Sequence, residues 1–559
     1  MRIRALALPA VLVLAFAVTA SADAGPNSAR FDRPYPGFAP AGTVLRAGSP
    51  AQAGLNAAPI DAFNRQLAAW VPSIYPGATA LLAHNGVVVD RTATGEAVKF
   101  QDATTQLPPD QQVPARTDTI YDLASLSKLF TSIVAVQQLE AGRIALDTPV
   151  AHYLPEFATN GKADITIEQL LTHTSGLIPD PIPSLWAGYP DIPSREKAIL
   201  DTTPSAAPGT QYVYSDLNML TMQLVLQQVT GKKLDELVRT GITEPLHMVD
   251  TGYNPPASKL SRIAATEYEV SPPRGMVRGS VHDENAWAMG GVAGHAGVFS
   301  TADDLAVLAQ AILNGGVYRG HRILSEHGVH LMQVNFNQKF PDDSHGLGFE
   351  LDQIWYMGGL SGPDTMGHTG FTGTSLVIDP RSRSFAILLT NRVHPTRNTP
   401  STNGARRAAA QALAQAMSVQ APDGGRSWFS GQGGGSTSTL TTGTLHGSVR
   451  VSFEAFVNTE TTDLLTLEAS TDGGTTWTAV PLTVRGRSGP QMSPQMSLSG
   501  QSSRSWQQVR AQVSNPSNDL MLRWRYTTDP SYEGRGVNVA DIELSCGRTT
   551  FTPVGWQLT

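Results

Sequence analysis

A serine and a lysine three positions apart form the most chemically suggestive pair in the sequence. Ser125 and Lys128 lie in the run Ser-Leu-Ser-Lys, directly before an apolar segment at 129–140. Residues i and i+3 of a helix project from one face. A serine hydroxyl is a weak nucleophile until a base removes its proton, and a lysine whose pKa is lowered by burial can be that base. The alternative is that Ser125 only caps the helix.

Spacing alone does not single out this pair, because Ser194 and Lys197 have the same separation. That second pair follows a proline and lies among charged residues, which is typical of a solvated helix start. Ser125 instead follows the mostly apolar segment 120–124 and precedes a helix that would bury Lys128. We therefore expect the chemistry at Ser125 and Lys128.

Two further segments carry groups that could complete a site. Tyr214 and Asp216 come before a second apolar segment, 217–229, and a tyrosine placed opposite a lysine can move protons to a leaving group. Alternatively, Tyr214 is a core residue and Asp216 a helix N-cap. His368 and Gly370 are expected to open a strand just before Phe371. A glycine there lets a substrate approach the backbone, and a free amide can stabilise an oxyanion. A tight turn with a surface histidine is the alternative.

The run from His282 to Asn285, together with His295, can also be read as a set of metal ligands. Its spacing matches no strong zinc pattern, and the sequence contains no His-Glu-x-x-His. We therefore predict no metal and no other cofactor. No Gly-x-Ser-x-Gly occurs either, so the sequence offers no nucleophile elbow as an alternative.

The elements around these residues indicate an α+β fold. A helix is expected over 58–70, followed by strands at 78–83 and 87–93 that Asn85 and Gly86 join as a hairpin. A second hairpin is expected much later, with strands at 375–378 and 385–390. The segments between the hairpins are mostly helical, which predicts one sheet built from both ends of a domain with a helical insertion.

The start of the chain resembles an export signal. Arg2 and Arg4 precede an apolar run at 5–18 and small residues at 20–24, so we expect a signal peptide over 1–24 and an exported, periplasmic or extracellular protein. An uncleaved anchor is the alternative, but no later segment reaches spanning length, and no stable membrane anchor is expected. An extended, unpacked arm should follow over 25–50.

The whole composition limits the partners and the crosslinks. The 559 residues include 40 basic and 47 acidic side chains, for a net charge of -7 and no basic block, so nucleic acid is not an expected partner. Cys546 is the only cysteine, so no intrachain disulfide can form, and we expect it to be a buried strand residue.

The composition changes after residue 417. Residues 418–425 are expected to be a linker, and 426–559 a separate β-sandwich with alternating strands near 449–455, 465–469 and 520–526. The run 470–477 is similar to an Asp-box turn. The sandwich resembles the jelly-roll modules of secreted bacterial proteases. It could bind a surface polysaccharide or protein, or only stabilise the chain.

Taken together, these segments resemble the serine β-lactamase and penicillin-binding protein superfamily. The similarity is to its class C β-lactamase-like branch, with its esterases, D-aminopeptidases and DD-carboxypeptidases. It covers about residues 45–415, and the stretches 167–177, 208–210 and 294–300 also look familiar. The resemblance implies an antiparallel sheet flanked by helices over 51–417. It also places the run 281–300 in a loop near the active site.

The resemblance assigns roles residue by residue. Ser125 would be the acylated nucleophile, Lys128 its base and Tyr214 the proton relay, with an oxyanion hole made by the amides of Ser125 and Phe371 next to Gly370. His368 stands where β-lactamases have lysine, and Asp216 stands where they have asparagine. Both would face the substrate. A neutral histidine binds a carboxylate less strongly than lysine, so anionic β-lactams are expected to be poor substrates.

The function expected from these observations is that of an exported serine hydrolase. It would acylate Ser125 and hydrolyse an ester or a D-amino-acid amide, with a small-molecule or cell-wall-derived peptide substrate. One alternative is a penicillin-binding DD-carboxypeptidase or a β-lactamase. Another is a surface-binding protein whose site has lost its activity.

Overall fold

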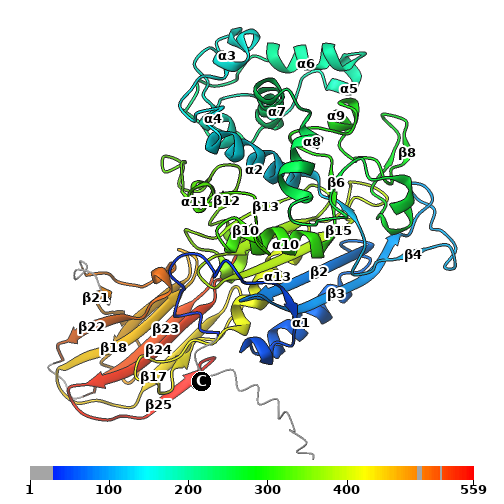
Figure 1. Ribbon diagram of the computed structural model, residues 1–559. Coiled ribbons are helices and arrows are strands. Elements are labelled where there is room, and N and C mark those ends of the chain that lie inside the picture. The colour runs from blue at the N-terminus through cyan, green and yellow to red at the C-terminus, as the bar shows by residue number, and fades with distance from the viewer. Residues whose placement is uncertain (1–28, 487–493, 516–518) are drawn as a thin grey trace, which may run out of the picture.

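A computed structural model describes residues 29–486, 494–515 and 519–559. In Figure 1 a helical region lies at the top, a large sheet in the middle and a second all-β region at the lower left. The expected signal peptide falls outside the described residues. Among the residues that are described, no helix is long and apolar enough to cross a membrane. The α+β class is confirmed.

The central sheet joins strands from both ends of its domain. Its order is β1 (Arg46–Ala47), β3 (Val87–Val98), β2 (Gly77–His84), β15 (Ser384–Thr390), β14 (Ser375–Asp379), β13 (Met366–Thr369) and β12 (Glu350–Leu351), and β4 (Val113–Pro114) pairs with β3. Only β1 pairs in parallel; the other strands are antiparallel. Both expected hairpins are present. Asn85 and Gly86 have φ of 48° and 79°, as a tight two-residue turn requires.

Each face of this sheet is covered by a different apolar cluster, because side chains alternate along a strand. Leu81 and Ala83 of β2 face the helical insertion and α10 (Ala302–Leu313). Ala80 and Leu82 face the opposite side, with α1 (Ala57–Ala69) and α13 (Asn403–Ala416).

Two buried helices of the insertion carry candidate residues at their starts. They are α2 (Ser127–Glu140) and α7 (Asp216–Thr230), which pack against each other. The remaining α-helices in this part of the chain are α3 (Val150–Tyr153), α4 (Ile167–Leu171), α5 (Leu185–Gly188), α6 (Ile192–Asp201), α8 (Leu234–Val238), α9 (Glu284–Ala288), α11 (Glu326–Gln333) and α12 (Ile354–Met357). A small sheet has the order β5 (Tyr121–Asp122), β9 (Val298–Ser300) and β6 (Gly252–Tyr253), and its strand β5 lies just before α2 in the chain.

The C-terminal region is a two-sheet sandwich. One sheet has the order β21 (Thr483–Gly486), β22 (Gln507–Val513), β18 (Val449–Asn458), β24 (Gly536–Leu544), β16 (Trp428–Phe429), β26 (Gln557–Leu558). The other runs β20 (Thr478–Ala479), β19 (Leu464–Ser470), β23 (Met521–Thr527), β17 (Thr437–Thr442), β25 (Phe551–Val554). The alternating residues of β18, β19 and β23 meet in one core around Trp524, as the sequence predicts. The turn at 470–477 is held by Asp472, which accepts hydrogen bonds from the amide and hydroxyl of Thr476.

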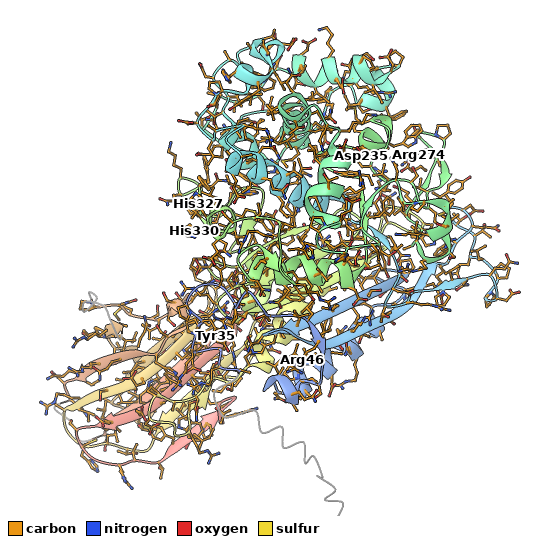
Figure 2. The ribbon with its side chains drawn as sticks, in the orientation of Figure 1. Tyr35, Arg46, Asp235, Arg274, His327 and His330 are labelled. Carbon is orange, nitrogen blue, oxygen red and sulfur yellow. The ribbon has the colours of Figure 1, made fainter. Side chains whose placement is uncertain are left out.

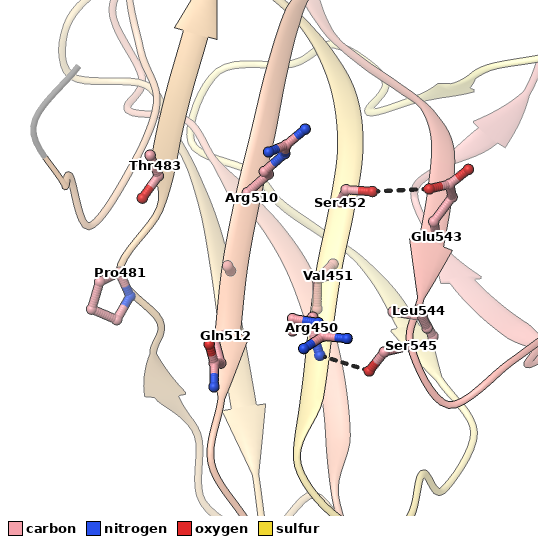
Figure 3. A pocket seen from close by; sticks show the side chains of 11 residues that line it. Arg450, Val451, Ser452, Pro481, Thr483, Arg510, Gln512, Glu543, Leu544 and Ser545 are labelled. Carbon is pink, nitrogen blue, oxygen red and sulfur yellow. Dashed lines mark hydrogen bonds between the residues drawn. The ribbon is translucent and has the colours of Figure 1, made fainter. Parts of the chain in front are cut away.

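A polar hollow of about 580 Å³ lies on the outer face of the first of these sheets. Figure 3 shows Arg450, Arg510, Gln512 and Glu543 on the neighbouring strands β18, β22 and β24 that form its floor. Arg510 lies opposite Ser452, and Gln512 opposite Arg450, in the β18–β22 pairing.

The arm that was expected to be extended and unpacked is packed at Phe31, which also contacts the expected linker. Phe31 is buried in a cluster that includes Phe456 and Trp506 of the sandwich and Tyr356 of α12 in the central sheet's domain. Its amide donates to the carbonyl of Ser418 in the expected linker. The sequence did not predict this contact, because proline and glycine surround the apolar side chains of the arm.

Tyr35, labelled in Figure 2, lies against the Arg383 guanidinium at 4.1 Å from the ring centroid, so the arm also follows the β14–β15 turn.

Cys546 is exposed and follows the end of β24. The expectation that Cys546 is a buried strand residue is therefore wrong, because the strand ends two residues before it.

Candidate active site

Ser125 lies on a short strained turn directly before α2. It belongs to a 3-10 turn over Ala124–Leu126. Ala124 has φ of 48°, a left-handed conformation that costs a non-glycine residue of order 1–3 kcal/mol. Asp122 holds the turn, because one carboxylate oxygen accepts from the amide of Ala124 at 2.8 Å and the other from the amide of His282 at 2.6 Å. Ser125 is half-buried, while its neighbours are buried.

Lys128 is buried beneath Ser125 and contacts three oxygen atoms. Its Nζ donates to Ser125 Oγ at 2.9 Å and to the carbonyl of His295 at 3.4 Å, and it lies 2.7 Å from Asp216 Oδ1. An ammonium group has three donors and no acceptor. The surroundings therefore fit the charged form of Lys128.

The pKa of Lys128 shifts in the direction opposite to the expected one. Burial lowers it, as anticipated, but the Asp216 carboxylate and Tyr214 together outweigh burial and raise the pKa above its ordinary value. The physical reason is Asp216: a carboxylate stabilises the neighbouring ammonium, whereas an amide would not. Asp216 is also not the N-cap of α7, since Ser215 occupies that position.

Tyr214 lies between Lys128 and a buried histidine. The Lys128 Nζ is 4.6 Å from the centre of its ring, and the His173 ring centre is 4.7 Å away. His173 Nδ1 accepts from the amide of Ser215 at 3.1 Å, which fixes the backbone beside Tyr214. Burial raises the pKa of Tyr214 to about 12, so the phenol keeps its proton at neutral pH and can donate it.

The turn between β13 and β14 is tied to the backbone that precedes Ser125. The hydroxyls of Thr372 and Thr374 donate to the carbonyls of Asp122 and Leu123 at 2.7 and 3.0 Å. Gly370 is required at this contact, because a Cβ there would lie 2.3 Å from the carbonyl oxygen of Leu123. This places the backbone of Phe371 opposite the turn of Ser125. The Phe371 ring is exposed and stacks on His282 at 5.8 Å between ring centres, which places His282 near the candidate site.

His368 is a buried, neutral histidine at the end of β13. It does not open a strand and is not a surface residue, because the turn follows it. Its Nδ1 lies 2.7 Å from the carbonyl oxygen of Thr369 and must therefore carry the hydrogen, which leaves Nε2 as an acceptor. No partner for Nε2 is found among the described residues. Burial, then the charge of Lys128, lowers the pKa of His368 to about 3.

Three acidic side chains, those of Asp180, Asp216 and Asp283, lie in the neighbourhood of Lys128. Asp283 pairs with the buried His295 at 2.9 Å, and burial, followed by the charges of Asp216 and Asp283, raises the pKa of Asp180 to about 6. Asp216, Asp283 and His295 could offer ligand atoms within 4.8 Å of one another. Each carboxylate already has a cationic neighbour in Lys128 or His295, so we assign no metal here.

Some of these residues escaped the sequence analysis. Asp180 lies in a proline-rich loop that carries no pattern, and only the fold brings it to Asp216. His173 lies within the familiar stretch 167–177, which was the available signal. The competing pair, Ser194 and Lys197, is confirmed as a solvated helix start: Ser194 joins a capping box with Asp191, and Lys197 is exposed.

Comparisons with known proteins agree with this architecture. The family model described as Beta-lactamase matches residues 72–411. A protein of Escherichia coli K12 named "Putative D-alanyl-D-alanine carboxypeptidase" is 33% identical over 389 residues, which are 64% of this chain and 88% of that protein. A protein of the same name from Salmonella agona is 32% identical over 396 residues, 64% of this chain and 89% of that protein.

Two solved structures share the fold at lower identity. A penicillin-binding protein homologue from Caulobacter crescentus has a TM-score of 0.51 and 22% identity, covering 64% of this chain and 97% of that one. EstCE1, described as a hydrolase with promiscuous acyltransferase activity, has a TM-score of 0.51 and 21% identity, covering 64% and 98%. The family model matches more than half of the chain, and the chain therefore belongs to the beta-lactamase family of serine hydrolases.

Proposed function

We propose that this protein hydrolyses an ester or a D-amino-acid amide through an acyl-enzyme on Ser125. The observation that carries the proposal is the contact of 2.9 Å between Lys128 Nζ and Ser125 Oγ, with Tyr214 packed beside the ammonium group. A nucleophile, a lysine that becomes a proton acceptor once it has lost its own proton, and a proton donor thus meet at one point.

The reaction divides among these groups. Ser125 Oγ attacks the carbonyl carbon of the substrate as its proton passes to Lys128 in the amine form. The amides of Ser125 and Phe371 receive the oxyanion, and neither takes part in the loop and turn hydrogen bonds of the described residues. Tyr214 gives its proton to the leaving group, and water then releases the acyl group.

The substrate class follows from the charges around Ser125. Lys128 is paired with Asp216, and His368 is neutral, so neither is a free cation for a substrate carboxylate. This favours neutral esters and amides over anionic β-lactams. The names of the relatives support a peptide with D-amino acids derived from the cell wall, and they keep a DD-carboxypeptidase as the second candidate.

Export and the role of the sandwich complete the proposal. The pattern of residues 1–24 supports a periplasmic or extracellular location. The polar hollow with Arg450 and Arg510 supports binding of a surface polysaccharide rather than a protein, because its floor offers charged and hydrogen-bonding groups without exposed aromatics. Cosedimentation with cell-wall polymers, compared between the protein and its Arg510→Ala variant, tests this role.

The catalytic proposal is tested by Ser125→Ala beside Ser194→Ala. Hydrolysis of a p-nitrophenyl ester should be lost in the first variant and unchanged in the second. The melting temperatures of both should stay close to that of the parent, because a hydroxyl at a helix start contributes only about 1 kcal/mol. Retained turnover in folded Ser125→Ala would remove the proposal.

A further inference from the structure

Arg406 is a buried cation that contacts the backbone of the candidate site. It lies near the start of α13, and only 7% of its surface is exposed. Its Nη2 donates to the carbonyl of Gly370 at 2.5 Å, and its Nη1 donates to Asn403 Oδ1 at 2.8 Å. Burial lowers the pKa of Arg406 to about 10, so the guanidinium is still charged at neutral pH.

Neither the helix nor the core favours a cation at this position. Burying a charge is costly unless the charge is paired, and the helix dipole disfavours positive charge near a helix N-terminus. Both acceptors of Arg406 are uncharged oxygens, and the charges of Arg392 and Glu350 act on it with opposite signs. A methionine would fill much of the same space without these costs. The charge is therefore best explained by what it does to the Gly370 carbonyl.

The Gly370 carbonyl belongs to the same peptide unit as the Phe371 amide. Because a trans peptide is planar, its C=O and N–H groups point in opposite directions within one plane. The carbonyl accepts from the amide of Gly373 at 2.9 Å as well as from Arg406. Two donors thus fix this plane from the carbonyl side. The Phe371 amide points away from them and takes no part in the loop and turn hydrogen bonds of the described residues.

A guanidinium at the carbonyl also makes the amide a stronger donor. Hydrogen bonds in a chain polarise one another, and the effect is larger where water is excluded. A charged donor such as Arg406 makes a stronger hydrogen bond than a neutral one. It draws electron density toward the Gly370 oxygen and leaves the Phe371 amide hydrogen more positive. A donor that is fixed and polarised in advance stabilises an oxyanion without reorganisation during the reaction.

We propose that Arg406 is a positioning residue of the oxyanion hole, which orients and polarises the Gly370–Phe371 peptide from the side opposite to the substrate. This deepens the proposed function and rests on it, because an oxyanion forms only when Ser125 attacks a carbonyl carbon. Arg406 itself does not touch the substrate. Its effect passes through one peptide unit to the Phe371 amide, and Arg406 keeps its proton throughout.

The test compares two p-nitrophenyl esters of the same acid on the full-length protein: the ordinary oxygen ester and its thiono analogue, in which C=S replaces C=O. Sulfur is a weak hydrogen-bond acceptor, so the thiono ester gains little from the oxyanion amides. In Arg406→Met, kcat/KM for the oxygen ester should fall about tenfold or more, which is less than the ~10²–10³-fold loss on removing an oxyanion donor itself. The thiono ester should lose less, so the ratio of the two kcat/KM values should fall.

Arg407→Met is the matched control, because it makes the same change one residue along α13, where the guanidinium contacts the Trp355 carbonyl at 3.5 Å and lies 5.1 Å from the centre of the Tyr532 ring. Its ratio should equal that of the parent. An unchanged ratio in folded Arg406→Met, or equal losses for the two esters, would overturn the role of Arg406, which would then only support the fold. If the methionine variant does not fold, Arg406→Gln, which also lacks the charge, is judged by the same ratio. A parent protein that hydrolyses neither ester, or whose hydrolysis survives Ser125→Ala, would instead refute the proposed function.

Discussion

At the scale of single residues, the charge state of each group depends on its burial and on its charged neighbours. Lys128 stays charged because Asp216 lies beside it, and His368 stays neutral because burial and Lys128 disfavour its cation. The sequence identified Ser125, Lys128 and Tyr214 as a set, and the fold brings them together. The sequence could not predict whether the pKa of Lys128 is raised or lowered, because that depends on the distance between Lys128 and Asp216, which are 88 positions apart in the chain.

The variant His368→Lys tests whether the side chain at position 368 determines the preference for neutral or anionic substrates. A lysine would add a permanent cation where a substrate carboxylate is expected, and an ionic hydrogen bond of about 1.5–3 kcal/mol corresponds to about tenfold or more in acylation by penicillin. Neutral ester hydrolysis should change much less. The comparison needs kcat/KM for both substrates at one pH and salt concentration, with melting curves for both proteins. Rapid penicillin turnover by the parent, or an unchanged preference in the variant, would contradict this role.

At the scale of elements, the site depends on the close contact between the β13–β14 turn and the backbone before α2. The hairpins and the helices α2 and α7 follow from turn residues and apolar periodicity, so they could be predicted. The contact could not, because it joins residues about 250 positions apart through threonine hydroxyls. The position of β13 relative to His368 was not predicted either. A four-residue strand carries too little pattern to show whether it begins or ends near this residue.

Gly370→Ala tests that contact. The added Cβ would lie 2.2 Å from Thr374 Oγ1 and 2.3 Å from the carbonyl oxygen of Leu123, so the turn must shift. A displacement of about 1 Å at an oxyanion amide can cost about 10²-fold in kcat. Gly404→Ala in α13 is the control: a Cβ there meets nothing within 4 Å, and stability should rise by up to about 1 kcal/mol with activity unchanged. Equal activity in the two variants would show that the close approach does not matter.

At the scale of the whole molecule, the sandwich is joined to the hydrolase region by a buried ion pair. Arg504 of the sandwich region donates to Asp379 at the end of β14 at 2.6 Å, and both side chains are almost fully buried. Its guanidinium also lies 4.3 Å from the centre of the Phe31 ring. The two regions therefore share one apolar and ionic junction. Removal of residues 426–559 is therefore expected to expose this junction and to destabilise the hydrolase region.

Arg504→Ala measures the strength of that junction. Removing one partner leaves the Asp379 carboxylate buried without its cation, which typically costs about 3–5 kcal/mol. The exposed pair of Arg381 and Asp364 provides the control, because Arg381→Ala should cost less than about 1 kcal/mol. Denaturant unfolding of both variants gives the comparison. Equal losses would indicate that the junction does not hold the two regions together.

The most direct test of the central claim is to locate the covalent acyl-enzyme. The full-length protein is incubated with a fluorophosphonate and with a fluorescent penicillin, digested, and the labelled peptide is identified by mass. Ser125 should carry the fluorophosphonate, penicillin should label it slowly, and Ser125→Ala should carry neither while Ser194→Ala labels normally. A label on any other residue, or labelling that persists in folded Ser125→Ala, would contradict the account.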